Sequence, residues 1–152
     1  MIQYVGKNIF DFPCDAICVT TNGVVKKDGE LVMGGGIALQ FKLRHSVLPT
    51  QLGLRVKQSG NKCYLITEPN KTIGYDYKYQ YVISFPTKNH YKDDSSLELI
   101  QESVSQLIEI SNVWKLKTIA LPFPGIGLGN LKYEEVLPLV ERLDDRFHLF
   151  RL

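Results

Sequence analysis

The sequence predicts an α/β domain with a mixed central sheet, and three observations point to it. Short apolar segments alternate with longer amphipathic ones through most of the chain, which is the pattern of a layered α/β domain. The continuous apolar run Ala16-Ile17-Cys18-Val19 is typical of a strand covered on both faces. Residues 63–67 and 81–85 read as two strands joined by a turn rich in Tyr and Lys, which indicates that the sheet is not purely parallel.

The remaining strands and the first helices follow in order along the chain. Strands are expected at residues 2–5 (at a sheet edge), 15–21, 118–121 and 147–152, and helices at 37–44 and 50–58. The polar excursion at 26–30 predicts a hairpin or loop, because Lys, Asp and Gly cluster there.

Residues 95–111 form the clearest predicted helix. Its apolar residues Leu97, Ile100, Val104, Leu107 and Ile108 follow the spacing of one buried helix face. Ser95 and Glu98 fit a capping box at its start. A last helix carries the apolar stripe between residues 133 and 143, where Pro138 must lie in the first turn or kink the helix.

Length and composition predict one globular domain spanning residues 1–152. The chain is 44% hydrophobic and 22% charged, which favours a globular protein over a disordered one. The net charge of +2 gives no general electrostatic case for binding nucleic acid or an acidic membrane. No apolar run approaches the roughly 20 residues of a membrane span, and no signal peptide is recognisable, so a cytoplasmic protein is expected.

The three cysteines, Cys14, Cys18 and Cys63, match no common zinc or redox spacing. Their apolar neighbours predict small buried side chains in a reducing compartment, without disulfides. No residue nearby is of the kind that stabilises a catalytic thiolate.

Two glycine-rich segments each stand between a predicted strand and a predicted helix. The first comprises Met33, Gly34, Gly35, Gly36 and Ile37, and the second Pro124, Gly125, Ile126, Gly127, Leu128 and Gly129. Glycines at a helix start let the backbone approach a ligand, and free N–H groups there attract anions. Neither segment is a Walker A loop or a dinucleotide fingerprint. Either one alone is also compatible with a flexible turn, but together they indicate a phosphate-bearing ligand.

A third segment, residues 83–91, leaves a strand and places Lys88, Asn89, His90 and Tyr91 side by side. Lys88 is either a functional amine or a solvated loop lysine. His90 has no second His or carboxylate at ligand spacing, so no metal is expected. Asn8 and Asn22 each end or begin an element and are either turn residues or ligand contacts.

Taken in order, these segments resemble the macro domain, a module that binds ADP-ribose. Lys7-Asn8-Ile9-Phe10 is similar to its opening motif, residues 15–22 to its second strand, and the two glycine-rich segments to its ligand loops. The resemblance covers essentially the whole chain. It implies a three-layer α/β/α fold with a mixed sheet, ADP-ribose bound through Asn8, Ile9 and both glycine-rich segments, and no cofactor.

Within this family the chain looks most like the branch that removes ADP-ribose from modified nucleic acid or protein. Met33–Lys42 and Ile83–Tyr91 carry that likeness, and it implies a catalytic role for Lys88, with Asn22 orienting the distal ribose. Three departures stand out: the 24–31 excursion, Asn8 in place of an aspartate, and Gly129 where a human relative has a catalytic aspartate. The last argues against a lysine–aspartate covalent mechanism but leaves hydrolysis of the antitoxin type open.

Three functions remain open on the sequence alone. The first is an ADP-ribosyl hydrolase, the second a non-catalytic reader of ADP-ribose, and the third a phosphatase acting on ADP-ribose 1″-phosphate. A generic nucleotide-binding domain is a fourth, weaker interpretation. The expected partner is ADP-ribose or an ADP-ribosylated nucleic acid or protein, with no membrane involved, and the oligomeric state stays open.

Overall fold

The computed structural model describes residues 1–152, and its centre is a six-stranded sheet in the order β1-β6-β5-β2-β4-β3. The strands are β1 (Ile2–Val5), β2 (Cys14–Thr21), β3 (Leu65–Ile66), β4 (Tyr79–Pro86), β5 (Ile119–Pro122) and β6 (Phe147–Arg151). Every neighbouring pair is parallel except β3 with β4, which is antiparallel. The mixed sheet and the edge position of β1 confirm the sequence prediction.

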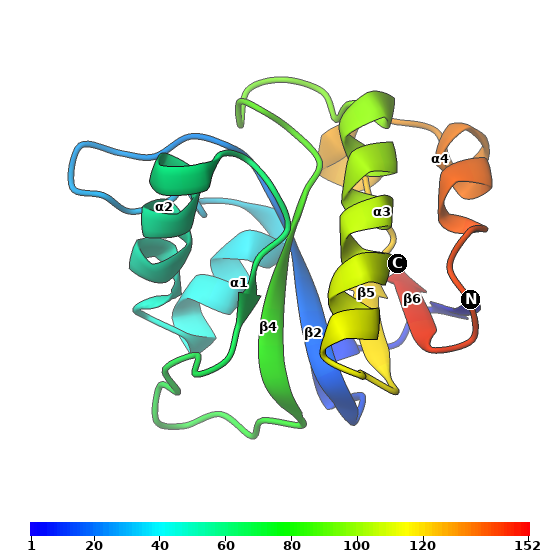
Figure 1. Ribbon diagram of the computed structural model, residues 1–152, viewed down its shortest axis with the longest axis horizontal. Coiled ribbons are helices and arrows are strands. Elements are labelled where there is room, and N and C mark those ends of the chain that lie inside the picture. Colours follow the sequence, from blue (N-terminus) through cyan, green and yellow to red (C-terminus); the bar gives the residue numbers. More distant parts are fainter.

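Two helices cover each face of this sheet (Figure 1). They are α1 (Gly36–Arg44) and α2 (Leu48–Ser59) on one face, and α3 (Leu97–Val113) and α4 (Tyr133–Val140) on the other. Two short 3-10 turns, η1 (Ile9–Asp11) and η2 (Gly127–Gly129), lie in connecting segments. The result is the three-layer α/β/α arrangement that the resemblance implied.

The alternation of side chains along β2 explains why the sheet needs helices on both faces. Ala16 and Cys18 pack into the core beneath α3 and α4, whereas Ile17 and Val19 pack with Phe41 beneath α1 and α2. All four β2 residues are completely buried. A strand segment buried on both sides is expected to be apolar at every position, as residues 16–19 are.

Helix α3 begins two residues later than the predicted range. Ser96 is its N-cap, and the Ser96 hydroxyl accepts a hydrogen bond from Leu99 N at 3.2 Å. The expected capping box of Ser95 and Glu98 is therefore wrong, and Ser95 is directed elsewhere. Ile100, Val104 and Leu107 form the buried face as predicted, and Ile108 is half-buried. Leu97, which was expected on that face, is exposed at the first residue of the helix.

Two other elements differ from expectation for local reasons. Strand β3 pairs over only two residues, because Cys63 N donates to Gln106 Oε1 and Tyr64 N donates to Ser84 Oγ instead of to a strand. Pro138 lies inside α4, beyond its first turn and close to its end at Val140. A missing amide donor near the end of a helix disturbs few backbone hydrogen bonds.

The cysteines occupy the positions expected of small hydrophobic residues. All three are free thiols, with Cys18 and Cys63 buried and Cys14 partly buried. Burial raises the pKa of the Cys14 and Cys63 thiols to about 12, so neither forms a thiolate readily. None of the helices combines the length and apolar character needed to cross a membrane.

Candidate functional site

The candidate site lies at the carboxyl ends of the three central strands, β5, β2 and β4. The loops that leave these strands are linked by backbone hydrogen bonds: Thr87 N to Thr21 O at 3.0 Å, and Ser95 N to Gly129 O at 2.8 Å. Ligands of open α/β sheets bind at this edge. All three sequence segments that suggested chemistry therefore meet there, although residues far apart in the chain supply them (Figure 1).

The first glycine-rich loop leads into the amino terminus of α1. Gly35 is the N-cap residue and no side chain caps the helix, so the first N–H groups have no partner within it. Gly36 has φ +56°, a conformation that side chains with a Cβ rarely adopt. Met33 is buried in the core at 3% exposure, so its side chain anchors the loop. This loop therefore presents backbone donors and the positive end of a helix dipole.

The second glycine-rich loop faces the first. Gly125 and Gly127 both have positive φ, +81° and +69°. A methyl group at Gly125 would lie 2.7 Å from Ile100 Cδ1, so this residue lets the loop sit tightly on α3. Leu128 is largely exposed and reaches across to the first loop, since a methyl group at Gly36 would lie 3.0 Å from Leu128 Cδ1.

Lys88 joins the third segment to the second glycine-rich loop. Its Nζ donates a hydrogen bond to the carbonyl oxygen of Leu128 at 3.1 Å, and the side chain is half-buried. The amine thus lies beside the backbone of a loop that itself contacts Gly36. The Lys88 side chain is therefore not directed into solvent, which was the alternative that the sequence left open.

The two candidate asparagines have their side chains engaged in turns. Asn22 Nδ2 donates to Val32 O at 2.9 Å, while Asn22 Oδ1 accepts from Val24 N at 2.9 Å. Asn8 Oδ1 accepts from Phe10 N at 3.0 Å and caps η1. Ile9 is buried next to it. Both amides thus fix the conformation of loops at this edge of the sheet, and their contacts with a ligand stay a prediction.

The 24–31 excursion is a hairpin docked on α2, in keeping with the expected hairpin or loop. Val25 and Leu31 form an antiparallel bridge, and Leu31 N donates to Pro49 O at 2.8 Å. Gly53 of α2 leaves no room for a side chain, because a Cβ there would collide with the carbonyl of Gly29. The excursion is thereby held close to the first glycine-rich loop that it precedes.

Two contacts of this region were missed by sequence reasoning. Asn61, in the connection between α2 and β3, donates from Nδ2 to the carbonyl oxygen of Lys88 at 2.9 Å. Ser95 fills the space beside Gly129, where any Cβ would collide with the Ser95 hydroxyl. Both contacts join residues distant in sequence. Asn61 belongs to no recognisable motif, and the only motif that Ser95 suggested was the helix cap, which the structure assigns to Ser96.

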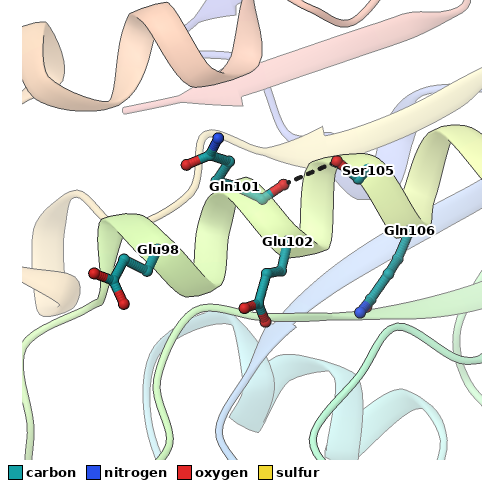
Figure 2. Close-up of a pocket in the computed structure, with 5 residues that line it drawn as sticks. All are labelled: Glu98, Gln101, Glu102, Ser105 and Gln106. Atoms are coloured by element: carbon teal, nitrogen blue, oxygen red, sulfur yellow. Dashed lines mark hydrogen bonds between the residues drawn. The ribbon is translucent and has the colours of Figure 1, made fainter.

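His90 and the outer face of α3 are not part of the loop arrangement. His90 Nδ1 accepts from Lys92 N at 3.1 Å, and its ring packs on Tyr91 with centroids 4.4 Å apart. A shallow hollow on α3 is lined only by polar residues and includes no residue of either glycine-rich loop (Figure 2). No group of three or more His, Cys, Asp or Glu side chains is arranged to hold a metal ion.

Comparison with curated proteins finds several bacterial relatives. The chain is 31% identical over 140 residues to the DNA ADP-ribosyl glycohydrolase of Thermus aquaticus, covering 90% of this chain and 36% of the relative. It is 30% identical over 139 residues to the Mycobacterium tuberculosis protein of the same name, again with 90% and 36% coverage. The chain thus spans about a third of the length of these relatives.

Solved structures give the same picture at the level of the fold. The macrodomain of Mycobacterium tuberculosis DarG has a TM-score of 0.79 and 28% identity, covering 100% of this chain and 98% of that one. Thermosipho africanus DarTG, solved in complex with ADP-ribose, has a TM-score of 0.79, 21% identity and coverage of 98% and 41%. The family model of the macro domain matches residues 26–140. This chain therefore belongs to the macro domain family.

Proposed function

We propose that this domain binds ADP-ribose and hydrolyses the bond that joins it to a modified DNA base. The position of Lys88 carries the proposal, because its Nζ lies 3.1 Å from the carbonyl oxygen of Leu128 in the second glycine-rich loop, and the Leu128 side chain reaches the first. Curated relatives at 30–31% identity are named DNA ADP-ribosyl glycohydrolases, which supports this reaction over others in the family.

The two glycine-rich loops are proposed to hold the diphosphate. In this proposal, backbone N–H groups at the start of α1 bind it from one side, and the Gly125–Gly129 backbone binds it from the other. Such donors compensate a dianion without a salt bridge, which suits a chain with a net charge of only +2. Leu128 lies across Gly36 in this structure, so we expect it to move aside or cover the bound phosphates.

Lys88 is proposed to assist the departure of the base. In the reaction, the bond from the ribosyl C1″ to the base breaks, a water oxygen bonds to C1″, and the water's proton balances the charge left on the base. The transition state resembles an oxocarbenium ion, so a donor near the leaving group lowers the barrier. In this structure the Lys88 ammonium donates a hydrogen bond to the Leu128 carbonyl. In the proposed reaction it donates instead to the leaving group or to a ribose oxygen.

Asn22 and Asn8 keep the roles predicted for them in this proposal. Asn22 makes one bond through each end of its amide, so one Nδ2 hydrogen and one Oδ1 lone pair are left for the distal ribose hydroxyls. Asn8, with Ile9, is proposed to contact the adenine. Water is proposed to attack C1″ directly, since position 129 is a glycine and supplies no carboxylate for a covalent intermediate.

A substrate panel tests the proposal. The protein is incubated with ADP-ribosylated single-stranded DNA, with a protein carrying carboxylate-linked ADP-ribose, and with ADP-ribose 1″-phosphate, and release of ADP-ribose is followed. We expect release from the DNA to be fastest. ADP-ribose binding without release from any substrate would identify a reader instead, and release from ADP-ribose 1″-phosphate but from neither other substrate would identify a phosphatase.

A further inference from the structure

We propose that Asn61 is a positioning residue for Lys88, an inference that rests on the proposed function of Lys88. Asn61 comes from the connection between α2 and β3, and Lys88 from the loop after β4. The two are linked only through the Asn61 side chain. Asn61 does not touch either glycine-rich loop through any hydrogen bond, so its influence on the reaction is expected to pass through Lys88.

The amide nitrogen of Asn61 uses both of its hydrogens on the Lys88 segment. One is donated to the Lys88 carbonyl oxygen at 2.9 Å and the other to Asn89 Oδ1 at 3.1 Å. Two acceptors fix which end of the amide points inward, since a carbonyl oxygen in this position would face the oxygen of Lys88. Asn61 therefore clamps two consecutive residues of the loop.

The Lys88 backbone has little else to hold it. Its own N–H lies 3.4 Å from Thr21 O, a long contact compared with the 3.0 Å of the neighbouring Thr87 N. At the far end of the side chain, Nζ is held by Leu128 O. Asn61 and Leu128 thus fix the two ends of a long, flexible side chain, which is the kind of constraint that keeps a reactive group in place.

Gly23 shows that the contact is built into the packing. A methyl group at Gly23 would lie 2.9 Å from Asn61 Nδ2 and 3.1 Å from Asn89 O. Gly23 N also donates to Asn89 O at 3.1 Å. Because Gly23 directly follows Asn22, the clamp connects the loop of Asn22 to the loop of Lys88.

The other end of the Asn61 amide makes no hydrogen bond within the protein. The two directional bonds of Nδ2 are therefore the contacts through which this side chain constrains the Lys88 segment.

Three variants test the proposal in different ways: Asn61→Ala, Asn61→Asp and Gly23→Ala. The first removes the clamp, the second places a carboxylate against the Lys88 carbonyl, and the third displaces Asn61 without altering it. We expect each to lower kcat for release of ADP-ribose from ADP-ribosylated DNA by about tenfold or more, as small misplacements of reacting groups do. The Kd for free ADP-ribose should change less than about twofold, because the glycine-rich loops are untouched.

Two comparisons separate this proposal from a general loss of structure. Asn70→Ala is the matched control, since Asn70 also joins two loops by bonds to Val47 N and Ser46 Oγ, but beyond the opposite end of α1. It should lower thermal stability without lowering kcat. The double variant Asn61→Ala/Gly23→Ala should lose no more kcat than the worse single variant.

Lys88→Ala is measured in parallel so that the two proposals fail separately. If Lys88→Ala turns over normally, the proposed function of Lys88 fails. If Lys88→Ala is inactive while the Asn61 and Gly23 variants keep full kcat, the positioning role is overturned. A fall in kcat and a matching fall in ADP-ribose affinity would also overturn it, because that result denotes a structural role.

Discussion

The Ser95 hydroxyl occupies the space that a side chain at position 129 would need. Ser95 N also donates to Gly129 O at 2.8 Å, so the start of α3 and the second glycine-rich loop are joined by both backbone and packing. The Ser95 hydroxyl is buried and has no hydrogen-bond partner of its own. The pair explains in physical terms why glycine, and no aspartate, stands at this end of the loop.

Gly129→Ala is expected to destabilise the protein by about 1–3 kcal/mol, the usual range for overpacking a tight contact. Ser95→Gly removes the colliding atoms and should recover part of that loss when combined with Gly129→Ala. Urea denaturation of the two single variants and the double variant measures the coupling free energy. Gly34→Ala is the control, because no atom lies within 4 Å of a methyl group there. Simple additivity of the two substitutions would contradict the packing described above.

Gly36→Ala is expected to weaken binding of ADP-ribose by roughly tenfold, about 1.4 kcal/mol. The new methyl group meets Leu128 at 3.0 Å, and the φ of +56° is strained for alanine. Gly74→Ala has the same kind of strain, at φ +105°, in open space away from the loops. Calorimetric titration should show normal affinity for Gly74→Ala, and equal affinities for both variants would refute a role for the Gly36 contact.

His45 predicts a pH dependence of stability. It is fully buried, its Nδ1 donates to Asn70 O, and its Nε2 lies 2.8 Å from the Tyr79 hydroxyl. Burial lowers its pKa below the value of about 6.5 that it has when unfolded. The contribution of neutral His45 to the free energy of unfolding is therefore complete above pH 6.5. It is lost as the pH falls from 6.5 toward the lower pKa of the folded state.

Unfolding free energies at pH 7, 6 and 5 check this prediction. His45→Gln should be less stable than the original protein at pH 7 but lose less stability on acidification. Some dependence will remain, because burial lowers the pKa of His148 as well. Identical pH profiles for the two proteins would mean that the protonation of His45 is not linked to folding.

The elements with strong local patterns were predictable from sequence. The buried face of α3 follows from helical spacing, and the doubly buried β2 follows from its continuous apolar run. The true cap of α3 was not predictable, because Ser95 and Ser96 offer the same hydroxyl one residue apart. Ser95 differs from Ser96 only through a tertiary contact, because its hydroxyl packs against Gly129, 34 residues away in the sequence.

The sequence predicted which segments form the candidate site, but it did not predict the hydrogen bonds and packing contacts that join them. Both glycine-rich loops and Lys88 lie together as their order in the chain suggested. The clamp by Asn61 was invisible, since Ser59-Gly60-Asn61 reads only as the end of a helix. Which carbonyl an amide reaches depends on how α2 and β4 pack, and no local pattern encodes that.

The central claim is that Lys88 acts on the bond to the base, and single-turnover release of ADP-ribose from ADP-ribosylated DNA tests it most directly. The rates of the original protein, Lys88→Ala and Lys92→Ala are compared, Lys92 being an exposed lysine of the same loop. We predict that Lys88→Ala slows release by at least about 100-fold, a typical loss for a proton donor. Its Kd for ADP-ribose should stay within about threefold of the original. Lys92→Ala should react normally, and an unchanged rate in Lys88→Ala would contradict the account.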